Sequence, residues 1–411
     1  MSNVGLRRAN NQDSLAAVLA ESQEKWRRRG HLFMVADGMG AHAAGELASK
    51  LATDIIPLSY SKLPDRAPPQ ALLMATQDAN TQIHSRGEAS PDFHGMGTTC
   101  TVLLLLPQGA VLSHVGDSRA YRARGERIEQ LTFDHSLVWE MRAAGQIADE
   151  EASSFIPKNI ITRSLGPNAA VQVDLEGPFP LEVGDTFLLC SDGLSGQVRD
   201  EEMAAVLQSM PPAEAAQALI DLANLRGGPD NITVIVVRVL RLLPGQAGSG
   251  DSSPVAVRPV HPAIWLSLGT TSLAALGLLV MGHLLGALVA LLAAVGLAVA
   301  AVVQRYGGAE AEFTLDGRPL GRGPYRSSIC ASGSEFADQL ASVLAQLRDA
   351  ALLEQWAIDW TRFNDLYQRV GAARDAGDHP QLVREAFHAI RLMLDGLKQQ
   401  HARERQKGSD E

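Results

Sequence analysis

Cysteine is scarce in this 411-residue chain, which has three cysteines and no CxxC pair. Cys100, Cys190 and Cys330 lie far apart, and the first two sit inside apolar runs, where a cysteine is usually a plain core residue. No charged-then-apolar segment of the kind that directs secretion opens the chain. This cysteine usage indicates a reducing compartment.

The chain also lacks an excess of positive charge. It has 36 Lys and Arg against 46 Asp and Glu, which gives a formal net charge of −10. This balance argues against a nucleic-acid-binding protein, because such proteins bind by neutralising phosphates. Most of the negative charge lies before residue 309, since residues 309–411 hold 16 acids and 13 bases. An acidic first region suits a protein that concentrates divalent cations, although solubility alone would also explain it.

Motifs for a covalent nucleophile are missing. The sequence has no GxSxG motif and no CxxxxxR loop, and it also lacks the phosphate-binding loop GxxxxGKS/T. Acyl-transfer or thiol chemistry of those types is therefore not expected, and neither is nucleotide hydrolysis by a P-loop.

Charged residues are absent from residues 263–303. A membrane-spanning helix needs about 20 apolar residues, so this 41-residue run is too long for one span and suits two, over 263–281 and 284–303. Gly282 and His283 are placed at the turn between them. Soluble cores rarely present so long a run without charge. A buried helical hairpin in a soluble core is the alternative.

Arginines flank this run on both sides, with Arg258 before it and Arg305 after it. Because positively charged flanks tend to stay in the cytoplasm, we expect the regions before and after the hairpin to lie on the cytoplasmic side of the cell (inner) membrane. Residues 243–262 are rich in Gly, Ser and Pro and have no periodicity, so they are expected to form a linker.

Residues 1–242 alternate short apolar or β-branched runs with helical patterns. Several strands follow one another through tight turns, which favours antiparallel pairing with helices packed outside. The sequence therefore predicts an α+β domain over this range. The expected strands are 32–36, 100–106, 110–115, 171–175, 186–190 and 232–239, and the expected helices are 43–60, 67–86, 136–145, 200–209 and 212–225.

Residues 304–411 are expected to be mainly helical. Apolar residues three or four apart predict one long amphipathic helix over about 335–370, opened by a capping box of Ser332 and Glu335. A second helix is expected over about 381–404, after a turn. Such helices suit dimerisation or docking, although a monomeric hairpin folding on itself explains them equally well.

Aspartates stand at the ends of several predicted strands. Asp37 and Asp192 each end an apolar run and are followed by glycine, Asp117 follows a third run, and Asp230 precedes a β-branched one. A turn would explain each aspartate alone. Four together favour a metal site, because Mg²⁺ and Mn²⁺ prefer carboxylate and carbonyl oxygens to clusters of Cys or His.

Two residues near the start of the chain, Arg8 and Asp13, extend this constellation. The planar guanidinium of an arginine can hold phosphoryl oxygens through two hydrogen bonds. Glycine after a ligand lets the backbone approach an ion. Two such ions can share a water, lower its pKa and stabilise an in-line displacement at phosphorus. The chemistry indicated is metal-assisted hydrolysis by water.

Eight segments resemble, in order and spacing, the bacterial branch of the metal-dependent protein phosphatases, also called PPM-type or type-2C serine/threonine phosphatases. They are RRANNQDS, VADGMGAHAAGELAS, GMGTTCTVLLL, VGDSRAY, LTFDHS, ITRSLG, LLCSDGLSG and GGPDNITVIV. The resemblance covers about residues 1–240. It implies a four-layer α-β-β-α sandwich of two antiparallel sheets, with a metal centre at one edge of the sandwich.

The resemblance implies a binding site for two Mn²⁺ or Mg²⁺ ions. Asp37, Asp192 and Asp230 match the metal ligands of the family, with the carbonyl of Gly38 as another. Asp117 together with Asp192 resembles the site of a third, weaker ion.

Arg8 matches the family's phosphate-binding arginine, and Asp13 an acid that supports the ligands without touching the ions. The stretch 140–165 corresponds to a mobile flap beside the active site. Two residues depart from the pattern. Gln12 replaces a carboxylate that orients metal-bound water. We expect this replacement to tune the activity rather than abolish it. Met39 replaces a histidine proposed as general acid in the eukaryotic branch, so another group must protonate the departing seryl oxygen.

His42 is a tempting substitute acid, but a place at the start of a helix is the favoured interpretation. The family also has a strand before the segment VGLRRANN, and this chain begins three residues ahead of it. Either the true start lies upstream or the sheet lacks its first strand.

The expected function is a membrane-anchored phosphatase that acts on phosphoseryl and phosphothreonyl proteins made by serine/threonine kinases. One alternative is a pseudophosphatase or scaffold that binds phosphoproteins at the membrane. Its signature is the loss of ligand aspartates, and none of the main ligand positions is lost here. Another alternative makes the hairpin and helical tail the functional core, with the phosphatase as their regulatory partner.

Overall fold

The computed structural model describes residues 1–40, 43–147, 157, 160–242, 262–306, 319–329 and 334–409. The chain forms two compact units. One unit is Met1–Ala247 together with Leu315–Glu411, and the other is Gly248–Thr314. The second unit is therefore an insertion in the first.

The first unit contains strands and helices close to the runs that the sequence predicts, together with further strands and helices outside those runs. Its strands are β1 (Ser2–Asn3), β2 (Asp13–Val18), β3 (His31–Met39), β4 (Gly97–Thr98), β5 (Cys100–Leu106), β6 (Gly109–Val115), β7 (Arg119–Arg124), β8 (Arg127–Gln130), β9 (Asp174–Phe179), β10 (Thr186–Cys190), β11 (Ile232–Arg238) and β12 (Arg326–Ile329). Its helices are α1 (Gln23–Arg29), α2 (Ala44–Ser61), α3 (Pro68–Glu88), η1 (Pro91–Phe93), α4 (Leu137–Ala143), α6 (Asp192–Ser195), α7 (Asp200–Ser209), α8 (Pro212–Leu225), α11 (Ser334–Leu353), α12 (Trp360–Asp375) and α13 (His379–Ser409).

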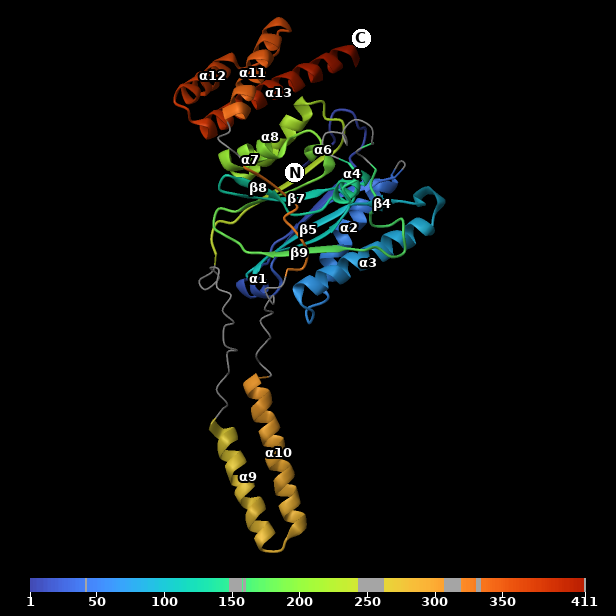
Figure 1. Ribbon diagram of the computed structural model, residues 1–411, viewed down its shortest axis with the longest axis vertical. Helices are drawn as coiled ribbons and strands as arrows, with labels where there is room; N and C mark the ends of the chain where they lie inside the picture. The colour runs from blue at the N-terminus through green and yellow to red at the C-terminus, as the bar shows by residue number, and fades with distance from the viewer. Residues whose placement is uncertain are drawn as a thin grey trace. The chain divides into compact units, whose positions relative to one another are not determined.

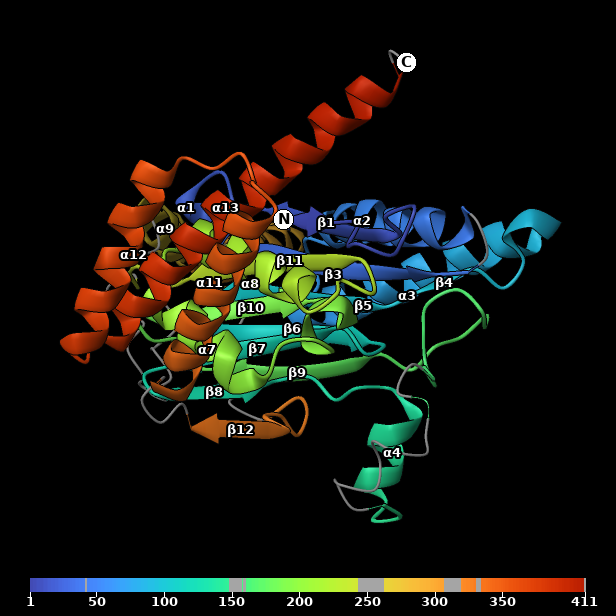
Figure 2. The same ribbon diagram turned by 90° about the horizontal axis from the view of Figure 1, so that it is seen from above.

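The strands form two sheets, and every pairing between the described strands is antiparallel. The first sheet has the order β1-β11-β10-β7-β8-β12, and the second has the order β2-β3-β5-β6-β9, with β4 beside β3. Figure 2 shows β12 at the outer edge of the first sheet, next to β8. The predicted α+β sandwich of two antiparallel sheets is confirmed.

Successive side chains of each strand point to opposite faces of its sheet, so each sheet contributes to two hydrophobic cores. In β3, Phe33 and Val35 face the core between the sheets, while Leu32 and Met34 join the core beneath α2 and α3. The first sheet sends Tyr121 and other side chains into a third core, beneath α7 and α8. Each sheet is therefore buried on both faces, and the ligand-bearing strand ends are held in a rigid frame.

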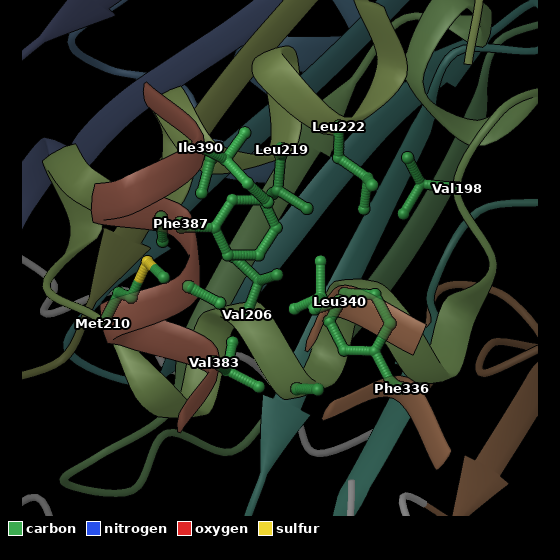
Figure 3. Close-up of a cluster of buried hydrophobic side chains, with 14 of the residues drawn as sticks. Val198, Val206, Met210, Leu219, Leu222, Phe336, Leu340, Val383, Phe387 and Ile390 are labelled. Atoms are coloured by element: carbon green, nitrogen blue, oxygen red, sulfur yellow. The ribbon is translucent and has the colours of Figure 1, made fainter. Parts of the chain in front are cut away.

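The C-terminal helices share this third core (Figure 3). Phe336 and Leu340 of α11 and Phe387 of α13 are buried against side chains from α7 and α8. Arg384 of α13 donates hydrogen bonds to the carbonyl of Ser209, at the end of α7. Figure 1 shows the three helices together on the outside of α7 and α8. The amphipathic faces that suggested dimerisation or docking are thus covered within the chain.

The prediction of a single helix over about 335–370 is wrong. The structure has α11 and α12, separated by residues 354–359. Gln355 has a φ of +56°, a left-handed conformation that ends a helix. Asp359 then caps α12, because its side chain accepts from the N–H groups of Thr361 and Arg362. The amphipathic period continues across the break, and no Gly or Pro marks it, so the pattern alone gave no sign of it.

A first strand is present at the edge of the first sheet. β1 pairs with β11, with Ser2 opposite Thr233 and Asn3 opposite Ile232. Of the two alternatives, the one in which the sheet lacks this strand is therefore wrong, although β1 is two residues long.

The second unit contains two helices, α9 (Pro262–Val280) and α10 (Leu284–Tyr306), which pack against each other. They are joined through Met281, Gly282 and His283, where the sequence predicts a turn, and Gly282 has a φ of +82°. Within the part of the chain that the structure describes, no helix is long and apolar enough to cross a membrane. The two predicted transmembrane spans are therefore not supported by the structure.

Candidate metal centre

The second sheet supplies the first candidate ligand, Asp37, near the end of β3. Thr99 holds the Asp37 backbone from two directions. Its hydroxyl oxygen accepts from the Asp37 N–H at 2.8 Å, and its own N–H donates to the Asp37 carbonyl at 2.9 Å. The Thr98 hydroxyl donates to the same carbonyl at 2.9 Å. The position of Asp37 is thus set by its backbone before any ion is considered.

Gly38 is required by close packing rather than by a turn. It lies within β3, paired with Thr98. A Cβ at this position would stand 2.0 Å from the carbonyl oxygen of Gly45 in α2 and 2.6 Å from that of Gln12. No side chain fits into those gaps. The Asp-Gly pair therefore lets α2 approach the strand end, and the simple turn interpretation of this pair does not hold.

Asp13 stands directly opposite Asp37 in the pairing of β2 with β3. Its Oδ2 accepts a hydrogen bond of 2.8 Å from the hydroxyl of Ser191, which follows β10 in the first sheet. Asp13 is buried, with 8% of its surface exposed. It therefore connects the two sheets behind the site.

The first sheet supplies Asp192, which follows β10 after one residue and opens the short helix α6. A Cβ on the next residue, Gly193, would stand 2.0 Å from the carbonyl oxygen of Asn231. The segments that carry Asp192 and Asp230 thus pack backbone against backbone, and the glycine is again needed for close approach.

Asp230 and Arg8 form an ion pair, with 2.7 Å between Arg8 Nη2 and Asp230 Oδ2. The two side chains are 51% and 32% exposed, so the pair contributes little to stability. Asn231 links the segments that carry Asp230 and Gln12. Its N–H donates to Asp230 Oδ1 at 2.9 Å, and its side-chain oxygen accepts from the Gln12 N–H at 2.8 Å.

Asp117 lies in the turn between β6 and β7. The residue before it, Gly116, has a φ of +113°, and a Cβ there would stand 2.6 Å from the Thr99 side chain. His135 holds this turn through two hydrogen bonds. Its ring Nδ1 accepts from the Gly116 N–H at 3.0 Å, and its backbone N–H donates to the Gly116 carbonyl at 2.7 Å. The other ring nitrogen of His135 lies 2.9 Å from Asp174.

The aspartates raise one another's pKa. For Asp37, burial and then the charges of Asp13, Asp192, Asp117 and Asp230 raise the pKa well above its usual value. Burial, followed by the charge of Asp192, raises the pKa of Asp117 to about 8. Burial is also the main cause that raises the pKa of Asp13 to about 6 and that raises the pKa of Asp192. Carboxyl groups pressed together in this way need positive charge to stay ionised near pH 7.

The chemistry of this cluster fits hard divalent cations. Oδ1 of Asp13, Asp117 and Asp192 is buried without a hydrogen-bond partner in the described residues, and buried carboxylate oxygens of this kind are costly unless a cation or donor meets them. As they stand, no three or more of the described His, Cys, Asp and Glu side chains are grouped so that they could hold an ion. The carboxylates would have to draw together around it, with carbonyl and water oxygens completing its shell.

The structure places the departures from the family pattern as follows. Gln12 lies beside the site, and its side-chain nitrogen reaches the carbonyl of Gly40 at 3.5 Å. Met39 is the last residue of β3. His42 lies outside the described residues, as does much of the expected flap 140–165. In the described part of that flap, Arg163 donates to Asp174 at 2.7 Å.

Sequence reasoning missed the residues that support the ligands. Each of four such residues lies inside one of the eight segments. Thr99 and Asn231 hydrogen-bond to the candidate ligands Asp37 and Asp230. Ser191 bonds the supporting Asp13, and His135 bonds Gly116, the residue before Asp117. For Ser191 and Asn231 the signal was a polar residue next to a predicted ligand, but Thr99 and His135 have no predicted ligand beside them in the sequence. That signal does not reveal which partner a small polar side chain binds, because the partners come from other strands.

The family model for protein phosphatase 2C matches residues 7–224, which is more than half of the chain. The chain belongs to the protein phosphatase 2C family. As a member of this family it is a protein serine/threonine phosphatase. The hairpin and the C-terminal helices lie outside the matched residues.

Curated relatives agree with this assignment. The chain is 39% identical over 238 residues to a putative protein phosphatase 2C-type of Streptococcus pyogenes serotype M6, a match that covers 57% of this chain and 94% of the relative. It is 39% identical over 265 residues to the serine/threonine protein phosphatase PstP of Mycobacterium tuberculosis, which covers 62% of this chain and 48% of PstP.

Solved structures agree as well. The Streptococcus agalactiae serine/threonine phosphatase superposes with a TM-score of 0.52 at 37% identity, covering 58% of this chain and 97% of that one. The Mycobacterium tuberculosis phosphatase PstP/Ppp superposes with a TM-score of 0.51 at 39% identity, covering 59% and 97%. The phosphatase portion of the fold is therefore shared with proteins of the same activity.

Proposed function

We propose that this phosphatase hydrolyses phosphoserine and phosphothreonine by direct attack of water at the carboxylate cluster. Asp37, Asp192 and Asp230, with the carbonyl of Gly38, would hold two ions, and Asp117 with Asp192 a third, weaker one. When bound, such ions lower the pKa of a shared water and polarise the phosphoryl group. The observation that carries the proposal is that Asp13, Asp117 and Asp192 each hold a buried carboxylate oxygen without a hydrogen-bond partner in the described residues.

Arg8 is proposed to bind the phosphoryl group. Its guanidinium is half exposed beside Asp230 and is always charged. When metal ions bind, their charge replaces the Arg8 guanidinium as the partner of Asp230. The planar guanidinium can then bind phosphoryl oxygens. Asp13, which is held by Ser191, supports Asp37 from behind rather than meeting the substrate.

The test is hydrolysis of phosphoserine and phosphothreonine peptides by the full chain, with Mn²⁺ or Mg²⁺ and with a chelator. We expect activity that depends on the metal, and activity that survived thorough chelation would refute the mechanism. Arg8→Ala should raise KM for phosphopeptides while Mn²⁺ affinity stays nearly unchanged. Loss of Mn²⁺ binding in Arg8→Ala would mean that this division of roles is wrong.

The second part of the proposal concerns the α9–α10 hairpin, which we propose associates with the cytoplasmic face of the cell membrane. The charge-free run 263–303 supports it, and so do the exposed large apolar side chains of the hairpin. Leu273 is 76% exposed and Leu285 is 79% exposed. Exposed apolar surface of this kind is typical of membrane or protein interaction sites. The full chain should therefore float with membrane vesicles, and its recovery wholly in the soluble fraction would refute the association. Reporter fusions at Gly250 and at the C-terminus should both read as cytoplasmic. Opposite readings at the two points would mean a single crossing.

The alternative of a pseudophosphatase that binds phosphoproteins is disfavoured, because none of the main candidate ligand aspartates is lost from the sequence. It predicts phosphopeptide binding without turnover. Measurement of released phosphate at saturating Mn²⁺ separates the two functions directly.

A further inference from the structure

A pocket of about 570 Å³ lies outside the carboxylate cluster, and both halves of the chain build it. Phe133, Trp139 and Arg142 come from the segment before the hairpin, and Tyr325 and Arg326 come from the segment after it. The three aromatic rings meet edge to face, since Phe133 lies 5.5 Å from Trp139 and 5.4 Å from Tyr325 between ring centroids. Cavities of this size bind small ligands or side chains of partners.

The pocket adjoins the proposed metal centre through one short segment. Phe133 lines the pocket, and His135, two residues later, holds the turn that carries Asp117. Arg119, two residues after Asp117, lies 5.6 Å from the centre of the Trp139 ring. The pocket is therefore linked through short segments to the turn that carries Asp117.

The segment that returns from the hairpin forms the outer wall. The Leu320 N–H donates to the carbonyl of Gly177 in the second sheet, and the Tyr325 N–H donates to the carbonyl of Gln130 in the first. The hydroxyl of Tyr325 donates to the carboxylate of Glu176. The wall is thus tied to both sheets, and Tyr325 is held in place.

We propose that this pocket binds an aromatic side chain of the phosphoprotein substrate, close in sequence to the phosphoresidue. This inference rests on the proposed function. Three partly buried aromatic rings offer the offset and edge-on contacts that another aromatic ring prefers. The guanidinium groups of Arg142 and Arg326 at the lining add contacts with the face of such a ring. Tyr325 and Arg326 lie outside residues 7–224, which the family model matches.

The test compares phosphothreonine peptides that carry Phe or Ala at each of the positions from −4 to +4. The control substrate is p-nitrophenyl phosphate, which has no neighbouring residue to place in the pocket while its phosphate is at the carboxylates. The full chain should show a kcat/KM about tenfold higher for the best Phe peptide than for its Ala partner. Tyr325→Ala should remove this preference and leave the p-nitrophenyl phosphate rate unchanged. Equal preference in Tyr325→Ala and in the parent chain would overturn the proposal.

Two controls separate recognition from structure. Tyr325→Phe keeps the ring and loses the hydroxyl that donates to Glu176, so it should keep the preference for Phe peptides. If it loses the preference as fully as Tyr325→Ala, the hydroxyl rather than the ring matters and the pocket is not a recognition site. Leu353→Ala, on an 84% exposed side chain of α11, should change neither rate. Failure to hydrolyse p-nitrophenyl phosphate at all would count against the proposed function instead.

Discussion

At the scale of single residues, the site is defined by carboxyl groups that repel one another. Asp192 interacts with both Asp37 and Asp230, and its environment disfavours its charged form. The sequence predicts the positions of these aspartates, because each follows or precedes an apolar strand. It does not predict the ion pair of Arg8 with Asp230, because 222 residues separate the two in the chain.

Asp192→Asn should abolish phosphatase activity and leave the fold intact. Removing one charge weakens the binding of a hard cation, so the rise in thermal unfolding temperature on adding Mn²⁺ should be lost. In chelator the variant should unfold at a higher temperature than the parent chain, because repulsion within the cluster is relieved. If the variant instead unfolded at a lower temperature than the parent chain in chelator, the Asp192 carboxylate would stabilise the metal-free fold rather than destabilise it.

The metal-free chain should lose stability as pH rises. Asp117 has a folded pKa of about 8, above its ordinary value. The folded state therefore binds more protons than the unfolded state, and the stability that this contributes is lost as pH rises through about 8. Thermal unfolding in chelator between about pH 6.5 and 8.5 measures it, across the upper part of the interval between the unfolded pKa of about 3.9 and the folded pKa. Asp117→Asn should flatten the curve, and saturating Mn²⁺ should do the same.

At the scale of elements, the helix α8 has the bounds that the sequence predicts, 212–225, and the strands agree with their predicted runs within a few residues. The partners of the C-terminal helices were not predictable. An amphipathic stripe requires a covered face and does not say what covers it. The structure shows that α7 and α8 provide that cover, through side chains such as Val206 and Leu219.

Phe387→Ala should destabilise the first unit by about 3–5 kcal/mol, because the ring is removed from a packed core and leaves a cavity. The side chain is 4% exposed and lies 6.4 Å from the ring of Phe336 between centroids. Urea unfolding followed by far-UV circular dichroism measures the effect. The matched control is Leu352→Ala, on a 57% exposed side chain of α11, which should change the free energy of unfolding by about 0.5 kcal/mol or less.

At the scale of the whole molecule, the phosphatase fold is not confined to the residues that resemble the family. β12 adds the outermost strand to the first sheet, and three C-terminal helices cover its helical layer. A fragment of residues 1–242 should therefore expose an apolar face on α7 and α8 and be less soluble and less stable than the full chain. Sedimentation and thermal unfolding of the two proteins measure this, and equal behaviour would show that the C-terminal helices add nothing to stability.

Because the hairpin interrupts one folded unit, the chain on either side of it behaves as a natural pair of complementing fragments. A protease that cut within the hairpin would break the polypeptide but not the unit, since strand pairing between β8 and β12 and the core around Phe387 need no covalent link. The nicked protein should elute as one species and separate into two bands in denaturant. The separately produced halves could then be recombined, so that phosphatase stability reports their association.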